Sequence, residues 1–488
     1  MPDVKGHAMA NETMLHFVDR AQAYPPKREA LDRREDFAEI ARRYAVPNAE
    51  EQAGRCSQCG VPYCTVHCPL HNHIPDWLRL TAEGRLREAY ELSNATSTMP
   101  EICGRICPQD RLCEGNCVIE FSGHGAVTIG SVEKFITDTA WDEGWVEPVQ
   151  VGPARGQSVG IVGAGPAGLS AADWLRTAGY EVHVYDRHDR AGGLLTYGIP
   201  GFKLEKHVVT RRVARLKDAG IVFHEGFSVG EDATLDELRQ RHDAVLIATG
   251  VYKPRAIAAG GGDLAGVVEA LDYLTASNRK GFGDAVPAFE DGSLDAAGKH
   301  VVVIGGGDTA MDCVRTAIRQ NAASVRCLYR RDRANMPGSQ REVGHAEEEG
   351  AEFVWLSAPE GFEGGDRVER VRVSGMRLGP ADASGRRAPE IDPAGGSTMP
   401  ADLVIKALGF DAEDLPTMFG APELGVTRWG TLRVDGKTMM TSLDGVFAAG
   451  DIVRGASLVV WAIRDARDVS ERIHAWLKVK AKEAKVAA

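Results

Sequence analysis

The clearest pattern along the chain is a short apolar run that leads into a glycine turn and then into apolar residues at helical spacing. The first copy is an apolar strand over 158–162, the turn Gly163-Ala164-Gly165-Pro166-Ala167-Gly168, and a predicted helix over 169–178. A second strand is predicted over 181–185, and Asp186 follows it. Such a turn lets backbone N–H groups approach a pyrophosphate at the helix N-terminus. The complete order of strand, turn, helix, strand and acidic residue therefore predicts a dinucleotide site rather than a plain tight turn.

The same pattern occurs again about 140 residues later. A strand over 300–304 enters Gly305-Gly306-Gly307-Asp308-Thr309-Ala310, a helix is predicted over 311–320, and a strand over 324–329 ends at Arg330 and Arg331. The residue that closes the second strand indicates the nucleotide. Asp186 accepts ribose hydroxyls and repels a 2′-phosphate, so the first site suits FAD or NAD. The two arginines suit the 2′-phosphate of NADP(H), unless they belong to a solvated basic loop.

Further loops stand at the ends of predicted strands, where α/β sheets bind their ligands. A glycine-rich loop after Asp186 can pass close to a ligand, and an aspartate after a late apolar strand can bind the ribityl chain of a flavin. A helix beginning near Ser457 would direct its N-terminus at the flavin, where its dipole would stabilise negative charge on the reduced flavin. The alternative is that the apolar residues of this helix serve only to pack in the core. The candidate residues in this group are Gly193, Leu194, Ala248, Thr249, Gly250, Gly409, Gly450, Asp451 and Ala462.

The remaining pattern of apolar and polar residues predicts how the chain divides into domains. Residues 1 to about 50 are polar and predict short helices and loops, whose surface either faces a partner or is simply solvated. Apolar spacing over 74–92 predicts one helix. Alternating residues over 368–399 predict antiparallel strands, and the last helix is expected to end near Lys478, before a fraying tail. We therefore expect an α-helical domain over 1–150, a nucleotide-binding domain over 151–255 that is completed by 411–488, and a second nucleotide-binding domain over 256–410.

Eight of the ten cysteines lie between Cys56 and Cys117. They form two runs of four, each with a Cys-Pro step. Zinc ribbons prefer paired C-x2-C knuckles, and only Cys56 and Cys59 fit that spacing. Two four-cysteine runs instead suggest two-cluster ferredoxin ligation, in which the last cysteine of a run crosses to the other cluster. Iron–sulfur binding is thus favoured over zinc and over plain thiols. The runs are Cys56, Cys59, Cys64 and Cys68, then Cys103, Cys107, Cys113 and Cys117.

Composition narrows the class of protein. The 488 residues carry a net charge of −12, which gives nucleic-acid binding no electrostatic support. The start lacks an apolar signal segment, and no apolar run has the length that spans a bilayer. Clustered cysteines in a reducing compartment indicate metal binding before disulfides. We therefore expect a cytoplasmic protein that binds neither nucleic acid nor membrane.

Taken together, the two glycine turns, Ala248-Thr249-Gly250, Gly450-Asp451 and the cysteine runs resemble the small (β) subunit family of NADPH-dependent glutamate synthases. The stretch from Arg105 to Cys117 is an especially specific part of the likeness, which covers nearly the whole chain. The same module occurs in dihydropyrimidine dehydrogenase and in ferredoxin:NADP transhydrogenases. The resemblance implies an α/β fold: an N-terminal α-helical iron–sulfur domain, then two Rossmann-like domains of the disulfide-oxidoreductase type that bind FAD and NADPH.

The resemblance also implies ligands for two [4Fe-4S] clusters. Carried over position by position, one cluster takes Cys56, Cys59, Cys64 and Cys117, and the other takes Cys68, Cys107 and Cys113. The relatives use a glutamine as the fourth ligand of the second cluster. Glu133 stands at the matching position here, so Glu133 is the expected ligand and Cys103 its competitor.

The implied activity is electron input. NADPH would give a hydride to FAD, with no side chain needed as a general base, and single electrons would leave through the clusters. The acceptor would be the large (α) subunit, in a hetero-oligomer that makes L-glutamate from L-glutamine and 2-oxoglutarate. The alternatives are a subunit of a ferredoxin:NADP transhydrogenase, a stand-alone NADPH reductase of an unknown acceptor, and a non-catalytic assembly subunit.

Overall fold

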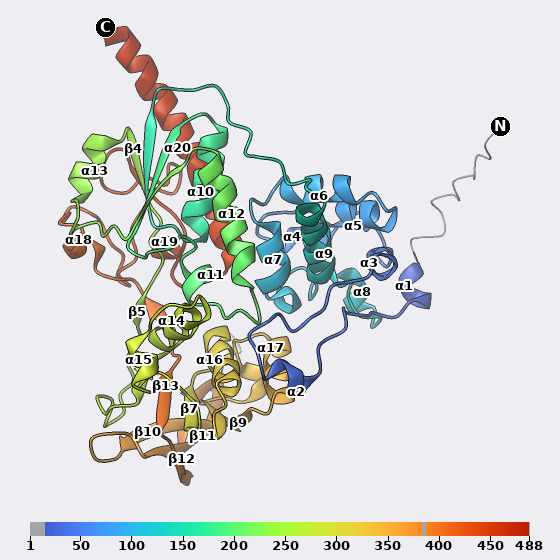
Figure 1. Cartoon of the computed structure of the whole chain (residues 1–488), viewed down its shortest axis with the longest axis vertical. Coiled ribbons are helices and arrows are strands. Elements are labelled where there is room, and N and C mark those ends of the chain that lie inside the picture. Colours follow the sequence, from blue (N-terminus) through green and yellow to red (C-terminus); the bar gives the residue numbers. More distant parts are fainter. Residues whose placement is uncertain (1–14, 383–386, 488) are drawn as a thin grey trace.

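The protein is described by a computed structural model that covers residues 15–382 and 387–487. An N-terminal helical domain lies beside one α/β domain, and a second α/β domain lies below both (Figure 1). This arrangement confirms the predicted fold class. The limits placed at residues 150, 255 and 410 stay predictions.

The helical domain is built around α9, Ile129–Asp142, whose buried face includes Val132 and Ile136. The single helix predicted over 74–92 is wrong: two helices stand there, because Gly84 between them takes a φ of +73°, which ends a helix. The other helices of this domain are α1 His16–Asp19, α2 Ala30–Arg33, α3 Val46–Ala53, α4 Tyr63–Val66, α5 Ile74–Ala82, α6 Leu86–Asn94, α7 Pro100–Ile106, the 3-10 turn η1 Gln109–Arg111 and α8 Val118–Phe121.

The first nucleotide-binding domain is a five-stranded parallel sheet in the order β15-β4-β1-β2-β3. Its strands are buried between helices, as parallel sheets require. The strand β15 comes from the C-terminal part of the chain, so the last segment completes the domain begun by β1. The elements are β1 Ser158–Val162, α10 Pro166–Thr177, β2 Glu181–Asp186, α11 Leu194–Tyr197, α12 Lys206–Asp218, β3 Val222–Glu225, α13 Leu235–Arg241, β4 Ala244–Ile247, β15 Val446–Ala448 and α19 Asp451–Arg454.

The second nucleotide-binding domain repeats this design, with a parallel sheet in the order β6-β13-β7-β8-β9. Two short antiparallel strands, β5 Lys253–Pro254 and β14 Phe410–Asp411, connect the two domains. The sheet and its helices comprise β6 Val267–Glu269, α14 Ala270–Gly281, α15 Pro287–Glu290, β7 His300–Ile304, α16 Asp308–Arg319, β8 Ser324–Tyr329, the 3-10 turn η2 Arg333–Asn335, α17 Gln340–Glu348, β9 Glu352–Trp355 and β13 Leu403–Lys406. The short helix α18, Leu415–Met418, packs instead in the core of the first nucleotide-binding domain.

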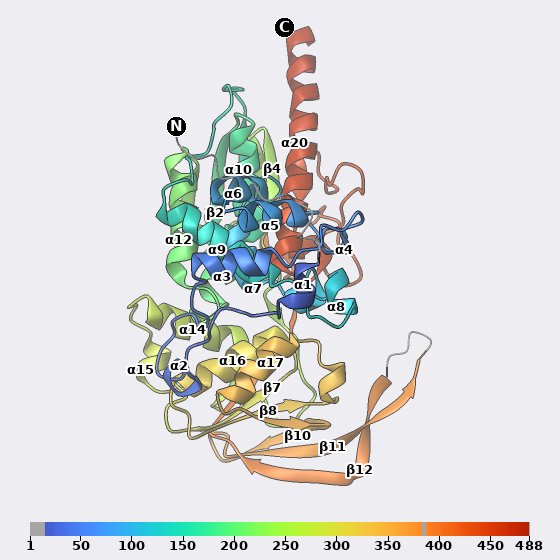
Figure 2. The same ribbon diagram turned by 90° about the vertical axis from the view of Figure 1, so that its right-hand side faces the viewer.

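The antiparallel strands predicted over 368–399 are confirmed. They are β10 Ser357–Glu363, β11 Arg370–Ala381 and β12 Arg387–Pro400, and they form a sheet that extends from the second domain (Figure 2). The predicted end of the last helix is wrong. Helix α20 runs unbroken over Val459–Ala487 and extends well beyond the first sheet, because its alanines and lysines favour helix over the expected frayed tail.

Most residues of the segment 20–44 are exposed, but the segment also makes contacts that its polarity did not predict. It runs along the second nucleotide-binding domain, where Lys27 and Arg33 both pair with Glu348, at 2.6 and 2.7 Å (Figure 1). Arg33 is only 2% exposed. Farther on, Glu39 pairs with Arg105 of the helical domain at 2.6 Å. The segment thus ties the helical domain to the second nucleotide-binding domain.

The helical domain and the first nucleotide-binding domain share one hydrophobic core. Leu70, Met99 and Ile102 of the helical domain pack in the same buried cluster as Leu195 and Ile463. A shared apolar core fixes the two parts relative to each other. In the described part of the chain, no helix has both the length and the apolar character needed to cross a membrane.

Candidate functional site

The first glycine turn has the geometry of a dinucleotide cradle. It joins β1 to α10, with Pro166 as the first residue of the helix, where a missing N–H costs nothing. A side chain at Gly168 would place its Cβ 1.9 Å from the carbonyl oxygen of Gly163, so only glycine allows this approach of helix to strand. Asp186 closes β2 and accepts the N–H of Ala164 at 2.6 Å, which holds the turn open.

The second glycine turn joins β7 to α16 in the same way. Gly307 is the N-cap of α16 and faces open space, with no heavy atom within 4 Å of a built Cβ. Asp308 is the first residue of the helix, and its Oδ1 accepts the N–H of Ser339 at 3.0 Å. The turn is therefore both shaped and open for a phosphate group at the positive end of the helix.

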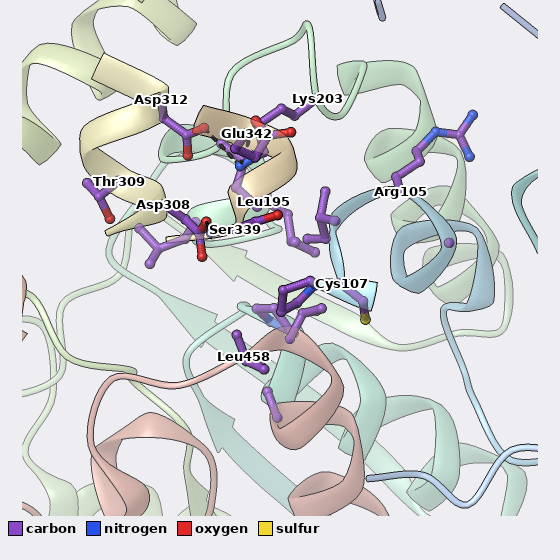
Figure 3. Close-up of a pocket in the computed structure, with 18 of the residues that line it drawn as sticks. Arg105, Cys107, Leu195, Lys203, Asp308, Thr309, Asp312, Ser339, Glu342 and Leu458 are labelled. Atoms are coloured by element: carbon purple, nitrogen blue, oxygen red, sulfur yellow. Dashed lines mark hydrogen bonds and ion pairs between the residues drawn. The ribbon is translucent and has the colours of Figure 1, made fainter. Parts of the chain in front are cut away.

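One cavity of about 730 Å³ joins the two turns to the cysteine domain. Its wall includes Asp308 and Thr309 of the second turn, the N-terminal end of α20, and Cys107 of the second cysteine run (Figure 3). The predicted site residues that line it are Gly163, Gly165, Pro166, Ala167, Asp186, Leu194, Ala248, Thr249, Gly250, Cys107, Asp308, Thr309, Asp451 and Ala462. The cavity is thus a single space in which two nucleotides and the second cysteine run can meet.

Other predicted residues do not line this cavity. Gly193 approaches Gly165, and Gly450 approaches the side chain of Ala167, so both shape the first turn. Arg330 is exposed and Arg331 is half-buried, at the end of β8. The remaining members of this group are Gly168, Gly305, Gly307, Ala310 and Gly409.

Two of the buried polar atoms that have no hydrogen-bond partner within the described residues belong to residues that are expected to contact the nucleotides. They are Oγ1 of Thr249 and Nε of Arg331. Buried polar atoms are rarely left unpaired, so each indicates a group that the chain itself does not supply. Thr249 lines the cavity, and Arg331 follows β8, the strand after the second glycine turn. The residues present therefore fit FAD at the first turn and NADPH at the second.

A group of charged residues in the cavity wall could not be found from the sequence. Nζ of Lys203, on the loop before α12, lies 2.9 Å from Oδ1 of Asp312 on α16 and 3.8 Å from Glu342 on α17 (Figure 3). Burial lowers the pKa of Lys203, but the two carboxylates raise it above its ordinary value. Burial raises the pKa of Asp312 to about 6, against the opposing effect of Lys203. This ion pair connects the two nucleotide-binding domains.

Replacing Lys203 by methionine should lower the free energy of unfolding by about 3 kcal/mol, because it leaves Asp312 buried without its cation. This value is near the lower end for breaking a buried ion pair, since Asp312 can take up a proton and become neutral. Urea unfolding followed by tryptophan fluorescence measures the change. The double variant Lys203→Met/Asp312→Asn should recover most of the loss, since it leaves no unpaired carboxylate there. A loss below about 1 kcal/mol in the single variant would show that the pair does not hold the domains together.

The eight clustered cysteines lie in two groups. Cys56, Cys59, Cys64 and Cys117 line one small cavity in the helical domain. Burial, followed by the charge of Cys117, raises the pKa of Cys64 to about 12. These four come from both runs, so the fold brings Cys117 across to the first run. Their mutual closeness fits a cluster with four thiolate ligands.

The second group lies at the boundary with the first nucleotide-binding domain. Cys68 and Cys107 pack against its core, and Cys107 also lines the cavity. A hydrogen bond that the Cys107 thiol donates to Cys103, together with burial and the charges of Cys103, Glu133 and Cys113, raises the pKa of Cys107 far above its usual value. The group thus combines three expected ligands with both candidates for the fourth position.

Glu133 is a buried carboxyl on α9. Burial raises its pKa to about 8, with a further contribution from the charge of Glu101. Asn72 donates a hydrogen bond to its Oε1 at 3.2 Å. Within the part of the chain that the structure describes, Glu133 has no cationic partner. Because a buried carboxylate needs a positive charge beside it to stay ionised, Glu133 is suited to bind a cation such as cluster iron. Among the described residues, no three His, Cys, Asp or Glu side chains are arranged to hold a single metal ion.

Comparison with known proteins identifies the two halves. The family model described as dihydropyrimidine dehydrogenase domain II, 4Fe-4S cluster, matches residues 33–145, and the pyridine nucleotide-disulphide oxidoreductase model matches 157–466. The glutamate synthase [NADPH] small chain of Azospirillum brasilense is 68% identical over 479 residues, which cover 98% of this chain and 99% of that one. The chain belongs to the glutamate synthase [NADPH] small-chain family.

Other members and neighbours agree with this family. The Escherichia coli glutamate synthase [NADPH] small chain is 44% identical over 96% of this chain and 100% of that one. The putative oxidoreductase AegA of the same organism is also 44% identical, over 95% of this chain and 72% of its own length. The structure of Mycobacterium tuberculosis FprA in complex with NADPH shares the fold, with a TM-score of 0.56 and 21% identity over 67% of this chain and 86% of that one.

The family assignment confirms the predicted class of protein. The chain is a pyridine-nucleotide oxidoreductase with a domain of the 4Fe-4S type. Sequence reasoning missed the parts of the site that come from distant segments, such as Lys203, Glu342 and the segment around Tyr24. No local signal marks them, since each meets the site only through the packing of domains.

Proposed function

We propose that this protein is the NADPH-oxidising electron-input subunit of a glutamate synthase. NADPH gives a hydride to FAD, and two [4Fe-4S] clusters pass single electrons to a large subunit that makes L-glutamate from L-glutamine and 2-oxoglutarate. The observation that carries the proposal is the single cavity in which both glycine turns and Cys107 meet. A shared cavity of this kind would hold the cofactors in a fixed geometry relative to each other.

The residues of the first turn hold FAD in this proposal, and those of the second hold NADPH. Asp186 faces the cavity beside Gly163 and would accept ribose hydroxyls. Arg330 and Arg331 make no ion pair with any described residue, which leaves their guanidinium groups available for a 2′-phosphate. The N-terminal end of α20, from Leu458 to Ala462, lines the cavity and would stabilise negative charge on a reduced flavin through its dipole.

The proposed cluster ligands follow the two cysteine groups. Cys56, Cys59, Cys64 and Cys117 hold the outer cluster. The inner one, beside the flavin cavity, takes Cys68, Cys107, Cys113 and Glu133, with Cys103 as the alternative fourth ligand. Iron–sulfur clusters accept one electron at a time, so they divide the pair delivered by the flavin. The shared apolar core around Leu70 and Met99 keeps the inner group close to the flavin site.

Replacing Glu133 by alanine should cause the inner cluster to lose iron or to be lost altogether, whereas Cys103→Ser should leave the cluster intact. The reason is that Glu133 has no cationic partner among the described residues and needs a cation to keep its charge while buried. Electron paramagnetic resonance of the reduced protein, with iron and sulfide analysis, measures both effects. An intact cluster in Glu133→Ala and a lost one in Cys103→Ser would assign Cys103 as the ligand.

The outer cysteine group lies near a surface suited to the large subunit. Tyr63 and Val118 border its cavity, and they are 49% and 40% exposed. Val61, Val66 and Phe121 are nearby in the chain and are 62%, 53% and 73% exposed. Large apolar side chains exposed together often mark protein contacts. We therefore place the electron exit and the partner contact on α4 and α8, in a hetero-oligomer that works in the cytosol.

The proposal is tested by glutamate formation from glutamine and 2-oxoglutarate, driven by NADPH, with the large subunit alone and with both chains. We expect formation only when both are present. The AegA likeness supports a second candidate, a reductase with another acceptor, because this module also occurs within a longer oxidoreductase. NADPH oxidation by artificial acceptors without any gain from the large subunit would favour that candidate.

A further inference from the structure

A polar bridge connects the second glycine turn to the second cysteine run. The loop 337–339, which precedes α17, lies between them. On one side, Gly338 donates its N–H to the carbonyl of Gly306 at 2.9 Å, and Ser339 donates its N–H to Asp308. On the other side, Oγ of Ser339 donates to the carboxylate of Asp110 at 3.1 Å. The iron–sulfur domain therefore reaches the edge of the nucleotide turn.

The two glycine turns differ at the first residue of the helix. Pro166 occupies that position in the first turn, and Asp308 occupies it in the second. A carboxylate at this position stands close to where the pyrophosphate would bind, and the two negative charges repel each other. The second turn therefore needs a nearby cation that the first turn does not.

Arg111 supplies a cation at this position. It belongs to the iron–sulfur domain, on the 3-10 turn between Cys107 and Cys113. Its Nη2 lies 3.5 Å from Oδ2 of Asp308, and its Nη1 donates to the carbonyl of Pro337. The Pro337 carbonyl holds the guanidinium in place, while the side chain remains 44% exposed. A guanidinium has five donors in a fixed fork, so several remain free for a phosphate.

We propose that Arg111, a residue of the iron–sulfur domain, binds the pyrophosphate of the nucleotide at the second glycine turn. The inference rests on the proposed function, in which NADPH occupies that turn. Arg111 would offset the charge of Asp308 and contact a phosphate oxygen directly. The nucleotide site is then built from two domains, and its pyrophosphate contact lies on the same short loop as two ligands of the inner cluster.

The test is nucleotide binding to the full-length protein with its flavin and clusters in place, measured by calorimetry. Arg111→Gln should weaken NADP⁺ and NAD⁺ by the same factor, about tenfold or more, because both contain the pyrophosphate. Binding of 2′-AMP, which lacks the pyrophosphate, should not change. Arg79→Gln, an exposed arginine of the same domain that pairs with Glu83, is the matched control and should bind all three as the parent does.

A second variant separates direct contact from an effect through Asp308. Adding Asp308→Asn to Arg111→Gln should recover only part of the affinity for NADP⁺, since the direct contact stays lost. Unchanged NADP⁺ binding in Arg111→Gln, a loss confined to NADP⁺ and 2′-AMP, or full recovery in the double variant would overturn the proposal. If the parent protein bound no NADP⁺, the proposed function would fail with it. Normal parent binding together with unaffected Arg111→Gln binding would reject the role of Arg111 alone.

Discussion

Replacing Cys113 by serine abolishes NADPH-driven glutamate formation but leaves reduction of the flavin by NADPH in place. The reason is the position of the second cysteine group, between the flavin cavity and the outer group. Burial, followed by the charges of Glu114, Cys68 and Glu133, raises the pKa of Cys113 well above the ordinary value. Losing a thiolate ligand there removes the inner cluster and with it the exit for single electrons.

The measurement compares two rates for the Cys113→Ser protein. Flavin bleaching by NADPH should stay within about threefold of the parent, while glutamate formation with the large subunit falls to background. Cys313→Ala is the matched control, because Cys313 is a buried cysteine on α16 outside both groups. Glutamate formation that survives in Cys113→Ser would show that electrons leave the flavin by another route.

Reversing the charge of Arg330 and Arg331 weakens NADPH far more than NADH. Charged hydrogen bonds contribute about 1.5–3 kcal/mol each, so Arg330→Glu/Arg331→Glu should reduce NADPH affinity by about a hundredfold or more. NADH lacks the 2′-phosphate, and its affinity should change by less than about threefold. The buried, unpartnered Nε of Arg331 is the structural reason for expecting a ligand contact there.

The readout is KM for each nucleotide in dye reduction, together with direct binding of NADP⁺ and NAD⁺. Arg333→Gln is the control, since Arg333 follows in the same loop but pairs with Glu347 at 2.7 Å. Equal losses for both nucleotides would mean that Arg330 and Arg331 do not hold the 2′-phosphate. A loss in the control equal to that in the double variant would point to the fold of the loop instead.

The sequence predicts those parts of the fold that depend on neighbouring residues. Both glycine turns, their strands and their helices were predictable because periodicity and glycine placement are local. The break at Gly84 also has a local cause, but apolar spacing continues across it and hides the turn. The end of α20 was placed too early, because lysines and alanines are consistent with both a solvated tail and a stable helix.

The candidate site was less predictable where it depends on packing between distant segments. Lys27 and Arg33 look solvated in the sequence because their partner, Glu348, lies more than 300 residues later. Lys203 likewise meets Asp312 only after two domains come together. Arg111 could be read as part of the cysteine run, but nothing near it in the sequence indicates Asp308 as its neighbour.

The central claim is that one cavity passes electrons from NADPH through a flavin to the inner cluster. Its most direct test is rapid anaerobic mixing of the full-length protein with NADPH, with flavin absorbance and cluster paramagnetism followed in time. We expect the flavin absorbance to bleach first and the clusters to become reduced only afterwards. Neither change should occur when NADPH is omitted. A flavin that never bleaches, or clusters that become reduced before it, would contradict the account.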